Sequence, residues 1–323
     1  MKTLYTLVLA ILIISCDNSE KKDTAILSKS VGNINTLQVV STNDLWNGEV
    51  GEEIRKYFAA PTDGLPQDEP LFSMNQMPPN AFSGFARKSR IILYARLGDE
   101  NKVSVAKDSY AKPQTIAYLT GQTKEDIIEL LALKHKQIID VFHDSEIKER
   151  QRRTNVDPIK PDSLKERFGV SLTMPSAYRV AHKGDDFYWM RKDLKSGSTN
   201  ILVYEVPLNM IGKDSTIIGD IIRVRDSIGG SLLPVEDEGH FQTEKAYAPF
   251  LFTTELDGKF AYETKGTWDV KDQFMAGPFL NYAVKDSAKN RYLILEGFTY
   301  APSVRKRDLQ FELESILKTA KIE

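Results

Sequence analysis

The sequence predicts an α+β protein with an N-terminal α/β sheet domain followed by a C-terminal, mainly antiparallel α/β sandwich. Three observations lead to this fold class. The first half alternates segments typical of strands and helices, whereas the second half is a run of strands with few helices. With 323 residues, of which 41% are hydrophobic, the chain can bury two ordinary cores. We place the domains at 36–154 and 155–323, because 155–162 holds two prolines and no hydrophobic stripe.

The first sixteen residues predict export and attachment to a membrane. Lys2, the apolar run 7–14 and the small Ser15 match a secretory signal peptide over 1–15. The run is shorter than the roughly 20 residues that a membrane span needs. Ile13-Ile14-Ser15-Cys16 resembles the bacterial lipobox, which implies acylation, as with palmitate, of Cys16, the only cysteine of the chain. The alternative is a plain secretory leader in which Cys16 occurs by chance. The polar stretch 16–35 is expected to be a flexible tether.

The first half of the chain is expected to form one sheet with helices packed against it. Strands are predicted at 36–40, 71–74, 90–96, 102–106 and 115–119. A helix over 44–59 is ended by the prolines and glycine of 61–66, and a short helix over 79–88 begins with proline. The longest helix is predicted over 123–153, because Thr123 and Asp126 have the spacing of a capping box.

The second half is expected to be a series of strands with two helices. The strands are predicted at 170–174, 178–181, 186–192, 200–206, 259–270, 277–285 and 291–300. One helix is expected over 215–228, stopped by Gly229 and Gly230, and another from about 303 to 320. The basic triplet 305–307 is expected to be a solvated helix start, with contact to lipid headgroups as the alternative.

Several motifs resemble those of a known family. These are Asp44-Leu-Trp-Asn-Gly48, Gly64-Leu-Pro66 with Glu69-Pro70, Phe187-Tyr-Trp-Met-Arg191, and Leu295-Glu-Gly-Phe-Thr-Tyr-Ala-Pro302. Together they look like an uncharacterised family of Bacteroidetes lipoproteins, a domain-of-unknown-function group of the DUF4837 type, which implies no assigned activity. The second half is also loosely similar to the sandwiches of Mog1-like and photosystem-associated (PsbP-like) proteins. That second similarity concerns a pattern of elements and implies a fold without a function.

The motifs of common catalytic and metal sites are missing. There is no Gly-x-Ser-x-Gly elbow, no His-Glu-x-x-His pair and no phosphate-binding glycine pattern. His143 and Glu146 share a helix face, either as partial metal ligands or as a solvated surface, and 235–239 is either a calcium loop or a solvated acidic turn. We therefore expect no catalytic residue, no metal and no cofactor.

Glu296 is the most notable charged residue of the second half. It shares one face of its predicted strand with apolar and aromatic side chains, namely Tyr292, Ile294, Phe298 and Tyr300. A carboxylate in such surroundings is either paired with a cation of another strand, such as Arg191, or contacts a ligand in a pocket. Glu296, Arg191 and Tyr300 are therefore the candidate ligand site or buried-charge site.

The function predicted from these observations is binding without catalysis. The net charge of -2 argues against nucleic acid as a partner. We expect a periplasmic or outer-membrane lipoprotein of the cell envelope, attached to the membrane by its N-terminal lipid, that binds a small ligand or another envelope protein. An exposed apolar patch would favour a protein partner. The alternatives are a hydrolase of an envelope polymer, which needs a deep polar cleft with perturbed titratable groups, or an accessory for envelope protein assembly.

Overall fold

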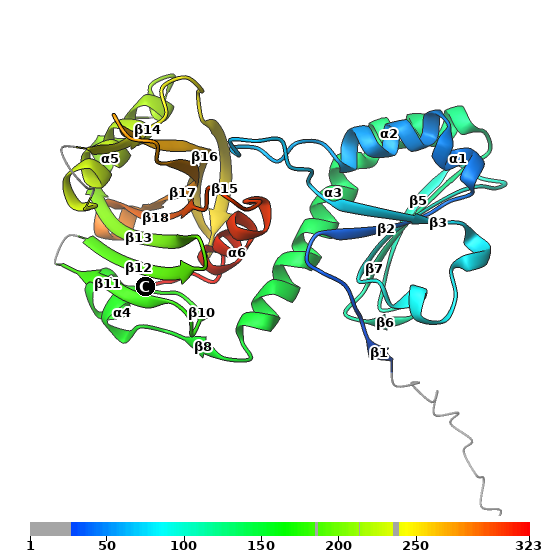
Figure 1. Ribbon diagram of the computed structural model, residues 1–323, viewed down its shortest axis with the longest axis horizontal. Coiled ribbons are helices and arrows are strands. Elements are labelled where there is room, and N and C mark those ends of the chain that lie inside the picture. The colour runs from blue at the N-terminus through cyan, green and yellow to red at the C-terminus, as the bar shows by residue number, and fades with distance from the viewer. Residues whose placement is uncertain (1–26, 185–186, 213, 235–238) are drawn as a thin grey trace, which may run out of the picture.

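The computed structural model describes residues 27–184, 187–212, 214–234 and 239–323. The predicted signal peptide 1–15, Cys16 and most of the acidic stretch 235–239 lie outside these residues. The α+β fold class is confirmed. Figure 1 shows two lobes, which we call the N-terminal lobe (27–154) and the C-terminal lobe (155–323). The long helix α3 (Lys124–Thr154) belongs to the first lobe and runs toward the second.

The N-terminal lobe contains a five-stranded sheet in the order β3-β2-β4-β7-β5. Its strands are β2 (Thr36–Val40), β3 (Ser73–Met77), β4 (Ile91–Leu97), β5 (Lys102–Lys107) and β7 (Thr115–Gly121). The first four strands in that order are parallel, and β5 joins β7 antiparallel at the edge. All five strands predicted for this half are therefore present, with ends shifted by a few residues.

Helices cover one face of this sheet. They are α1 (Asn43–Asn47), α2 (Glu49–Phe58) and α3, and they bury Ile54, Phe58 and Phe142 against the strands. The capping box is confirmed, because the Thr123 hydroxyl accepts from the Asp126 N–H and the Asp126 carboxylate accepts from the Thr123 N–H. The single helix predicted over 44–59 is two helices, since Gly48 has an extended conformation between them. The predicted helix over 79–88 is replaced by two 3-10 turns, Pro79–Ala81 and Gly84–Lys88.

The prediction of a flexible tether over 16–35 is wrong for the last part of this stretch. β1 (Ser28–Lys29) pairs with β6 (Ala111–Lys112), and the carbonyl oxygen of Asn33 accepts a hydrogen bond of 2.8 Å from Arg90. Strand pairing holds β1, and the buried side chain of Arg90 binds the carbonyl oxygens of Gly32 and Asn33, roles that the polar composition of this stretch does not indicate.

The C-terminal lobe is built on a curled antiparallel sheet with the order β11-β12-β13-β18-β17-β16-β14, and β15 also pairs with β16. Its strands are β11 (Arg179–Lys183), β12 (Phe187–Leu194), β13 (Gly197–Pro207), β14 (His240–Thr243), β15 (Phe250–Leu256), β16 (Lys259–Lys271), β17 (Ala276–Asp286) and β18 (Arg291–Tyr300). Short pairs β8 (Pro158–Ile159) with β10 (Met174–Pro175), and β9 (Val170–Ser171) with β19 (Lys321–Ile322), complete the lobe. The sequence predicted neither β14 nor β15.

Helices pack on both faces of the second sheet. α4 (Asp162–Phe168) and α6 (Arg307–Leu317) contribute to one core, and α5 (Ile217–Leu232) contributes to the other. The predicted stop of α5 at Gly229 is wrong, because the helix continues through both glycines. A Cβ on Gly229 would lie 2.4 Å from the ring of Phe241, so this glycine permits close packing against β14.

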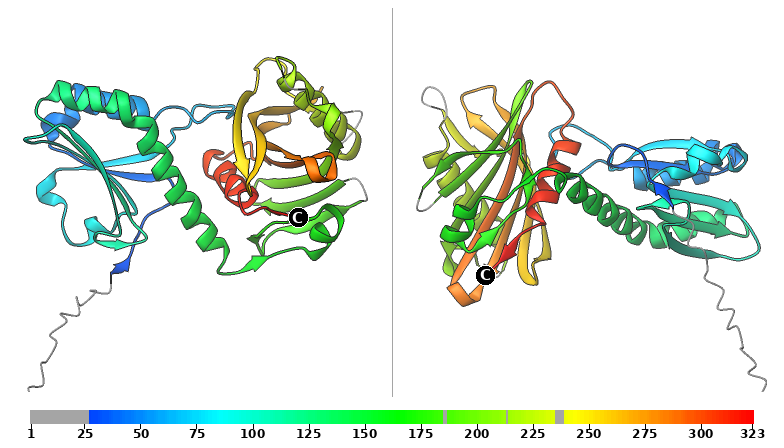
Figure 2. Two further views of the ribbon diagram at one scale, coloured as in Figure 1. Left: turned by 180° about the vertical axis from the view of Figure 1, so that it is seen from behind. Right: turned by 90° about the horizontal axis from the view of Figure 1, so that it is seen from below.

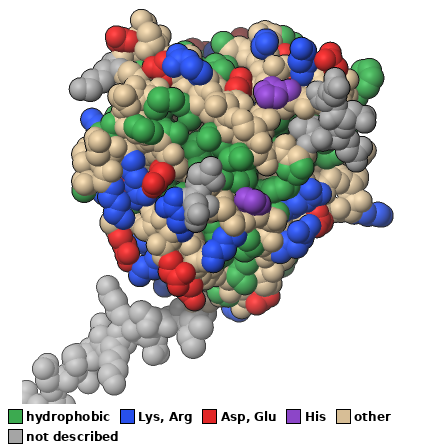
Figure 3. Space-filling model, turned by 90° about the vertical axis from the view of Figure 1, so that its left-hand side faces the viewer, with side chains coloured by type: hydrophobic (Ala, Val, Ile, Leu, Met, Phe, Trp, Pro, Cys, Tyr) green, Lys and Arg blue, Asp and Glu red, His purple; other side chains and the backbone are tan. Residues whose placement is uncertain are grey.

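The surface of the C-terminal lobe that Figure 3 turns to the viewer has hydrophobic side chains gathered near its middle, with Lys and Arg side chains around them. Within the residues that the structure describes, none of the helices combines the length and the apolar character that crossing a membrane requires.

Candidate functional site

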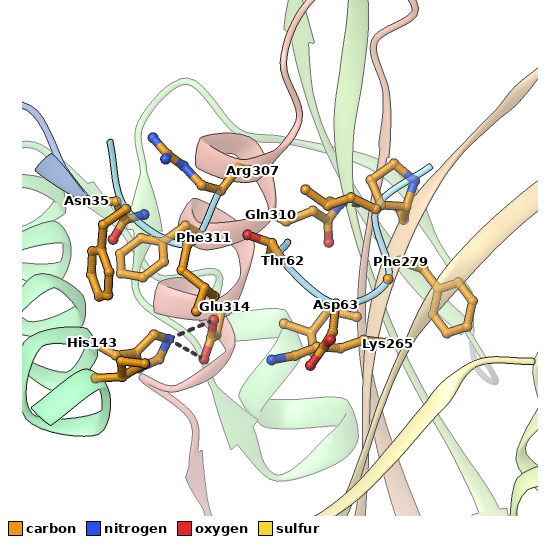
Figure 4. Close-up of a pocket in the computed structure, with 17 residues that line it drawn as sticks. Asn35, Thr62, Asp63, His143, Lys265, Phe279, Arg307, Gln310, Phe311 and Glu314 are labelled. Atoms are coloured by element: carbon orange, nitrogen blue, oxygen red, sulfur yellow. Dashed lines mark hydrogen bonds and ion pairs between the residues drawn. The ribbon is translucent and has the colours of Figure 1, made fainter. Parts of the chain in front are cut away.

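A cavity of about 110 Å³ lies between the two lobes. It is lined by the segment between α2 and β3, by α3, by β16 and β17, and by α6 (Figure 4). The segment between α2 and β3 reaches the second lobe at Gly64, which has a φ of +77°. A Cβ there would lie 2.8 Å from the backbone nitrogen of Gly266, so only glycine allows this approach.

Glu69 fixes the beginning of α6 from the other lobe. Its carboxylate accepts hydrogen bonds from the backbone N–H groups of Lys306 (2.6 Å) and Arg307 (3.1 Å), where a helix leaves donors unpaired. Arg307 in turn donates to the carbonyl oxygen of Pro70 at 2.9 Å. The expectation of a solvated basic triplet is therefore wrong for Lys306, which is 4% exposed, and for Arg307, whose side chain is 11% exposed.

His143 of α3 and Glu314 of α6 meet at one wall of the cavity. The Nε2 atom of His143 lies 3.1 Å and 3.2 Å from the two carboxylate oxygens of Glu314, as Figure 4 shows. Lys318 also contacts this carboxylate, at 2.8 Å. Burial would raise the pKa of Glu314, but the nearby His143, Lys265 and Lys318 outweigh burial and hold that pKa well below its usual range.

Lys265 of β16 supplies a partly buried positive charge on the opposite wall. Burial alone would lower the pKa of Lys265, but the carboxylates of Glu314, Glu263 and Asp63 outweigh burial and raise it. The closest of these contacts joins the Lys265 Nζ to Glu263 at 3.3 Å. Glu314 and Lys265 are thus held in their charged forms across neutral pH.

Two polar side chains at the cavity have unused hydrogen-bonding capacity. Asn35 is 3% exposed, and its side-chain amide has no hydrogen-bond partner within the described residues. The Thr62 hydroxyl is buried and likewise has no partner among them. An unpaired buried polar group such as the Thr62 hydroxyl costs about 1–3 kcal/mol of stability.

The metal interpretation of His143 and Glu146 is wrong, and so is the solvated one. Glu146 is fully buried and pairs with Arg90 at 2.5 Å and 2.9 Å, while His143 turns to Glu314. Among the residues described, no group of three or more His, Cys, Asp or Glu side chains could hold a metal ion.

The structure brings two residues of the predicted site together, Arg191 and Tyr300, and separates Glu296 from them. Glu296 is fully buried and accepts hydrogen bonds of 2.9 Å from both Arg225 and Asn281. Burial outweighs these partners and raises the pKa of Glu296. Arg191 pairs with Asp193 instead, at 2.7 Å, so the suggested ion pair with Glu296 is wrong. Arg191 and Tyr300 line a second pocket of about 210 Å³, and Glu296 is not among the described residues that line it.

Sequence reasoning missed most of the interlobe cavity. Glu314 belongs to the predicted last helix and Lys265 to a predicted strand. No sequence pattern indicates that these two residues lie close together in the fold. The one useful signal was the resemblance of Gly64-Leu-Pro66 and Glu69-Pro70 to family motifs, since these residues reach across to the second lobe.

Two family models match the chain, each along one lobe. A domain of unknown function (DUF4837) matches residues 157–319, about half of the chain, and a second domain of unknown function (DUF8532) matches residues 30–155. A comparison with curated proteins found no match. Residues that line the cavity come from both matched regions.

Proposed function

The chain belongs to the DUF4837 family, which is defined by a domain of unknown function, and we propose that it is a lipid-anchored cell-envelope protein that binds a small polar molecule between its lobes. The ligand would carry no net charge. The observation on which this rests is the cavity of Figure 4, where the side chain of Asn35 and the unpaired hydroxyl of Thr62 lie beside charges of both signs. A pocket between domains with a few converging polar groups is a common ligand site.

The charges of the cavity favour a net-neutral ligand. Lys265 and Arg307 are balanced by Glu314 and Asp63, so neither an isolated anion nor an isolated cation would find a matching excess of charge. The volume is below the roughly 150 Å³ of an apolar cavity that holds benzene, which limits the ligand to a few non-hydrogen atoms.

The same charges favour binding over hydrolysis. A general acid or base works best when its pKa lies near the working pH. Glu314 has a lowered pKa and Lys265 a raised one, so each keeps its charge instead of exchanging a proton near neutrality. Neither Glu314 nor Lys265 is therefore suited to act as a general acid or base near neutral pH.

The envelope location rests on the leader and on Cys16. Cys16→Ala should move the protein from the membrane fraction to the soluble fraction, and mass spectrometry of the native protein should find acyl chains on Cys16. An unmodified thiol at that position would contradict the anchor. Membrane pull-downs that recover one stoichiometric partner would instead favour the assembly accessory.

Ligand binding is tested with small probes and thermal unfolding. Acetamide and glycine, which carry no net charge, should raise the melting temperature by mass action, whereas acetate and methylammonium should have little effect. Asp63→Asn and Lys265→Met should abolish the rise, because each removes the charge balance of the cavity.

Asp68→Asn is the matched control, because Asp68 is exposed in the same segment and does not line the cavity. It should respond to the probes as the unmodified protein does. Equal responses to neutral and charged probes, or no response to any of them, would refute the proposed ligand class.

A further inference from the structure

The second pocket lies in the C-terminal lobe, on the face of the sheet that α5 covers. Its volume of about 210 Å³ exceeds the roughly 150 Å³ of an apolar cavity that holds benzene. Five aromatic side chains from β12, β14, β16 and β18 line the pocket, namely Trp189, Phe241, Trp268, Phe298 and Tyr300. The pocket is thus large enough for one substituted ring.

The aromatic wall is held in place from behind. Phe241 stacks on Trp268 with ring centres 5.0 Å apart, and Phe298 contacts both rings. The Arg225 guanidinium lies 4.9 Å from the Phe241 ring centre and is fixed by Glu296. Glu296 therefore supports the wall and does not contact the pocket, and a flat apolar body would meet a preformed surface.

The polar side chains of the pocket present donors. Arg191 uses its Nε for Asp193, and its two terminal nitrogens have no partner within the described residues. The Trp268 Nε1–H is buried and also lacks a partner there. Asn200 is 2% exposed and held by Trp189, whose Nε1 donates to its side-chain oxygen at 3.0 Å.

Among the described residues, the edge of the pocket around Arg191 has an excess of positive charge. Asp193 accepts hydrogen bonds from both Arg191 and Arg179, so one carboxylate neutralises only one of two guanidinium groups. No carboxylate is present among the described residues that line the pocket. The charge of this edge therefore suits an anionic group on the ligand.

We infer that this pocket binds a small aromatic carboxylate, with its ring against the aromatic wall and its carboxylate at the terminal nitrogens of Arg191. A guanidinium can bind a carboxylate through two parallel hydrogen bonds, which gives both strength and orientation. This site is separate from the interlobe cavity and does not depend on its function.

The inference is tested with a matched pair of probes, 4-hydroxyphenylacetate and its uncharged alcohol, 4-hydroxyphenylethanol. Isothermal titration should show saturable binding of the carboxylate to the full protein. Arg191→Gln should weaken this binding about fivefold or more while leaving the alcohol unchanged. Arg191 is half-exposed, so the variant should keep the fold, which thermal unfolding would confirm.

Arg179→Gln is the matched control, because Arg179 shares Asp193 with Arg191 but does not line the pocket. It should leave the binding of both probes nearly unchanged. Equal losses in the two arginine variants, equal affinity of the unmodified protein for the two probes, or no saturable binding of the carboxylate at millimolar concentration would each overturn the inference.

Discussion

The buried ion pair of Arg90 and Glu146 should be the charged contact of the N-terminal lobe whose loss destabilises the protein most. The Glu146 carboxylate binds two nitrogens of Arg90 and accepts the backbone N–H of Asn35 at 2.6 Å. Glu146→Gln leaves Arg90 with two backbone carbonyl oxygens and, as its nearest described carboxylate, Glu149 at 4.0 Å. We expect a loss of about 3 kcal/mol or more in the free energy of unfolding, measured with urea.

Glu129→Gln provides the comparison for this variant. Glu129 lies on the same helix and is exposed, so its substitution should change the free energy of unfolding by no more than about 0.5 kcal/mol. Similar losses of unfolding free energy in both variants would mean that the Arg90–Glu146 pair contributes no more to stability than an exposed charge does.

Glu314 should make the protein sensitive to acid. Its pKa in the folded protein is lower than the usual 4.5, so folding stabilises the charged form. The resulting stability is fully present above about pH 4.5 and is lost as the pH falls toward the lowered pKa. The difference in unfolding free energy between the unmodified protein and Glu314→Gln should therefore shrink below pH 4.5. Urea unfolding at several pH values measures this, and a constant difference would contradict it.

At the residue scale, the sequence predicts local pairs better than distant ones. The capping box of Thr123 and Asp126 depends on residues three positions apart, and the structure has it as predicted. The aromatic surroundings of Glu296 also follow from strand alternation. The identity of its partner, Arg225, does not follow from the sequence. Arg225 lies 71 positions from Glu296, and the pair forms only when α5 packs on the sheet.

At the scale of elements, α5 offers a paired test of its glycines. Gly229→Ala places a methyl group 2.4 Å from the ring of Phe241, so we expect a loss of about 1–3 kcal/mol in unfolding free energy from overpacking. Gly219→Ala in the same helix meets no atom within 4 Å and should stabilise the protein by up to about 1 kcal/mol. Thermal unfolding shows whether each substitution stabilises or destabilises the protein. Stabilisation by both substitutions would contradict the role assigned to Gly229.

The elements that the sequence missed lack the usual signals. β15 contains Phe250, Leu251 and Phe252, and all three are exposed, so no alternation of buried and exposed residues marks the strand. α4 begins directly after Pro161, at the end of the stretch 155–162 where we placed the domain boundary because of its prolines. Strands with a clear alternation, such as β16, were predicted to within a residue.

At the scale of the whole molecule, the lobes are joined by three connections. α3 runs to α6, the segment between α2 and β3 reaches β16, and Glu69 caps α6. None of these contacts follows from periodicity or from local motifs, which describe each lobe separately. The sequence therefore predicted the two sheets but not the cavity between them.

Glu69→Gln tests whether this junction holds the lobes together. The substitution removes the negative charge that accepts two backbone N–H groups at the start of α6, and a lost helix cap costs about 0.5–2 kcal/mol. We expect faster hydrogen exchange at the amides of Lys306 and Arg307 and a lower melting temperature. Asp68→Asn, in the same segment but exposed, should change neither. Because the cap joins residues of different lobes, exchange should also rise at cavity residues such as Gly64. Exchange confined to α6 would mean that Glu69 stabilises one helix and does not couple the lobes.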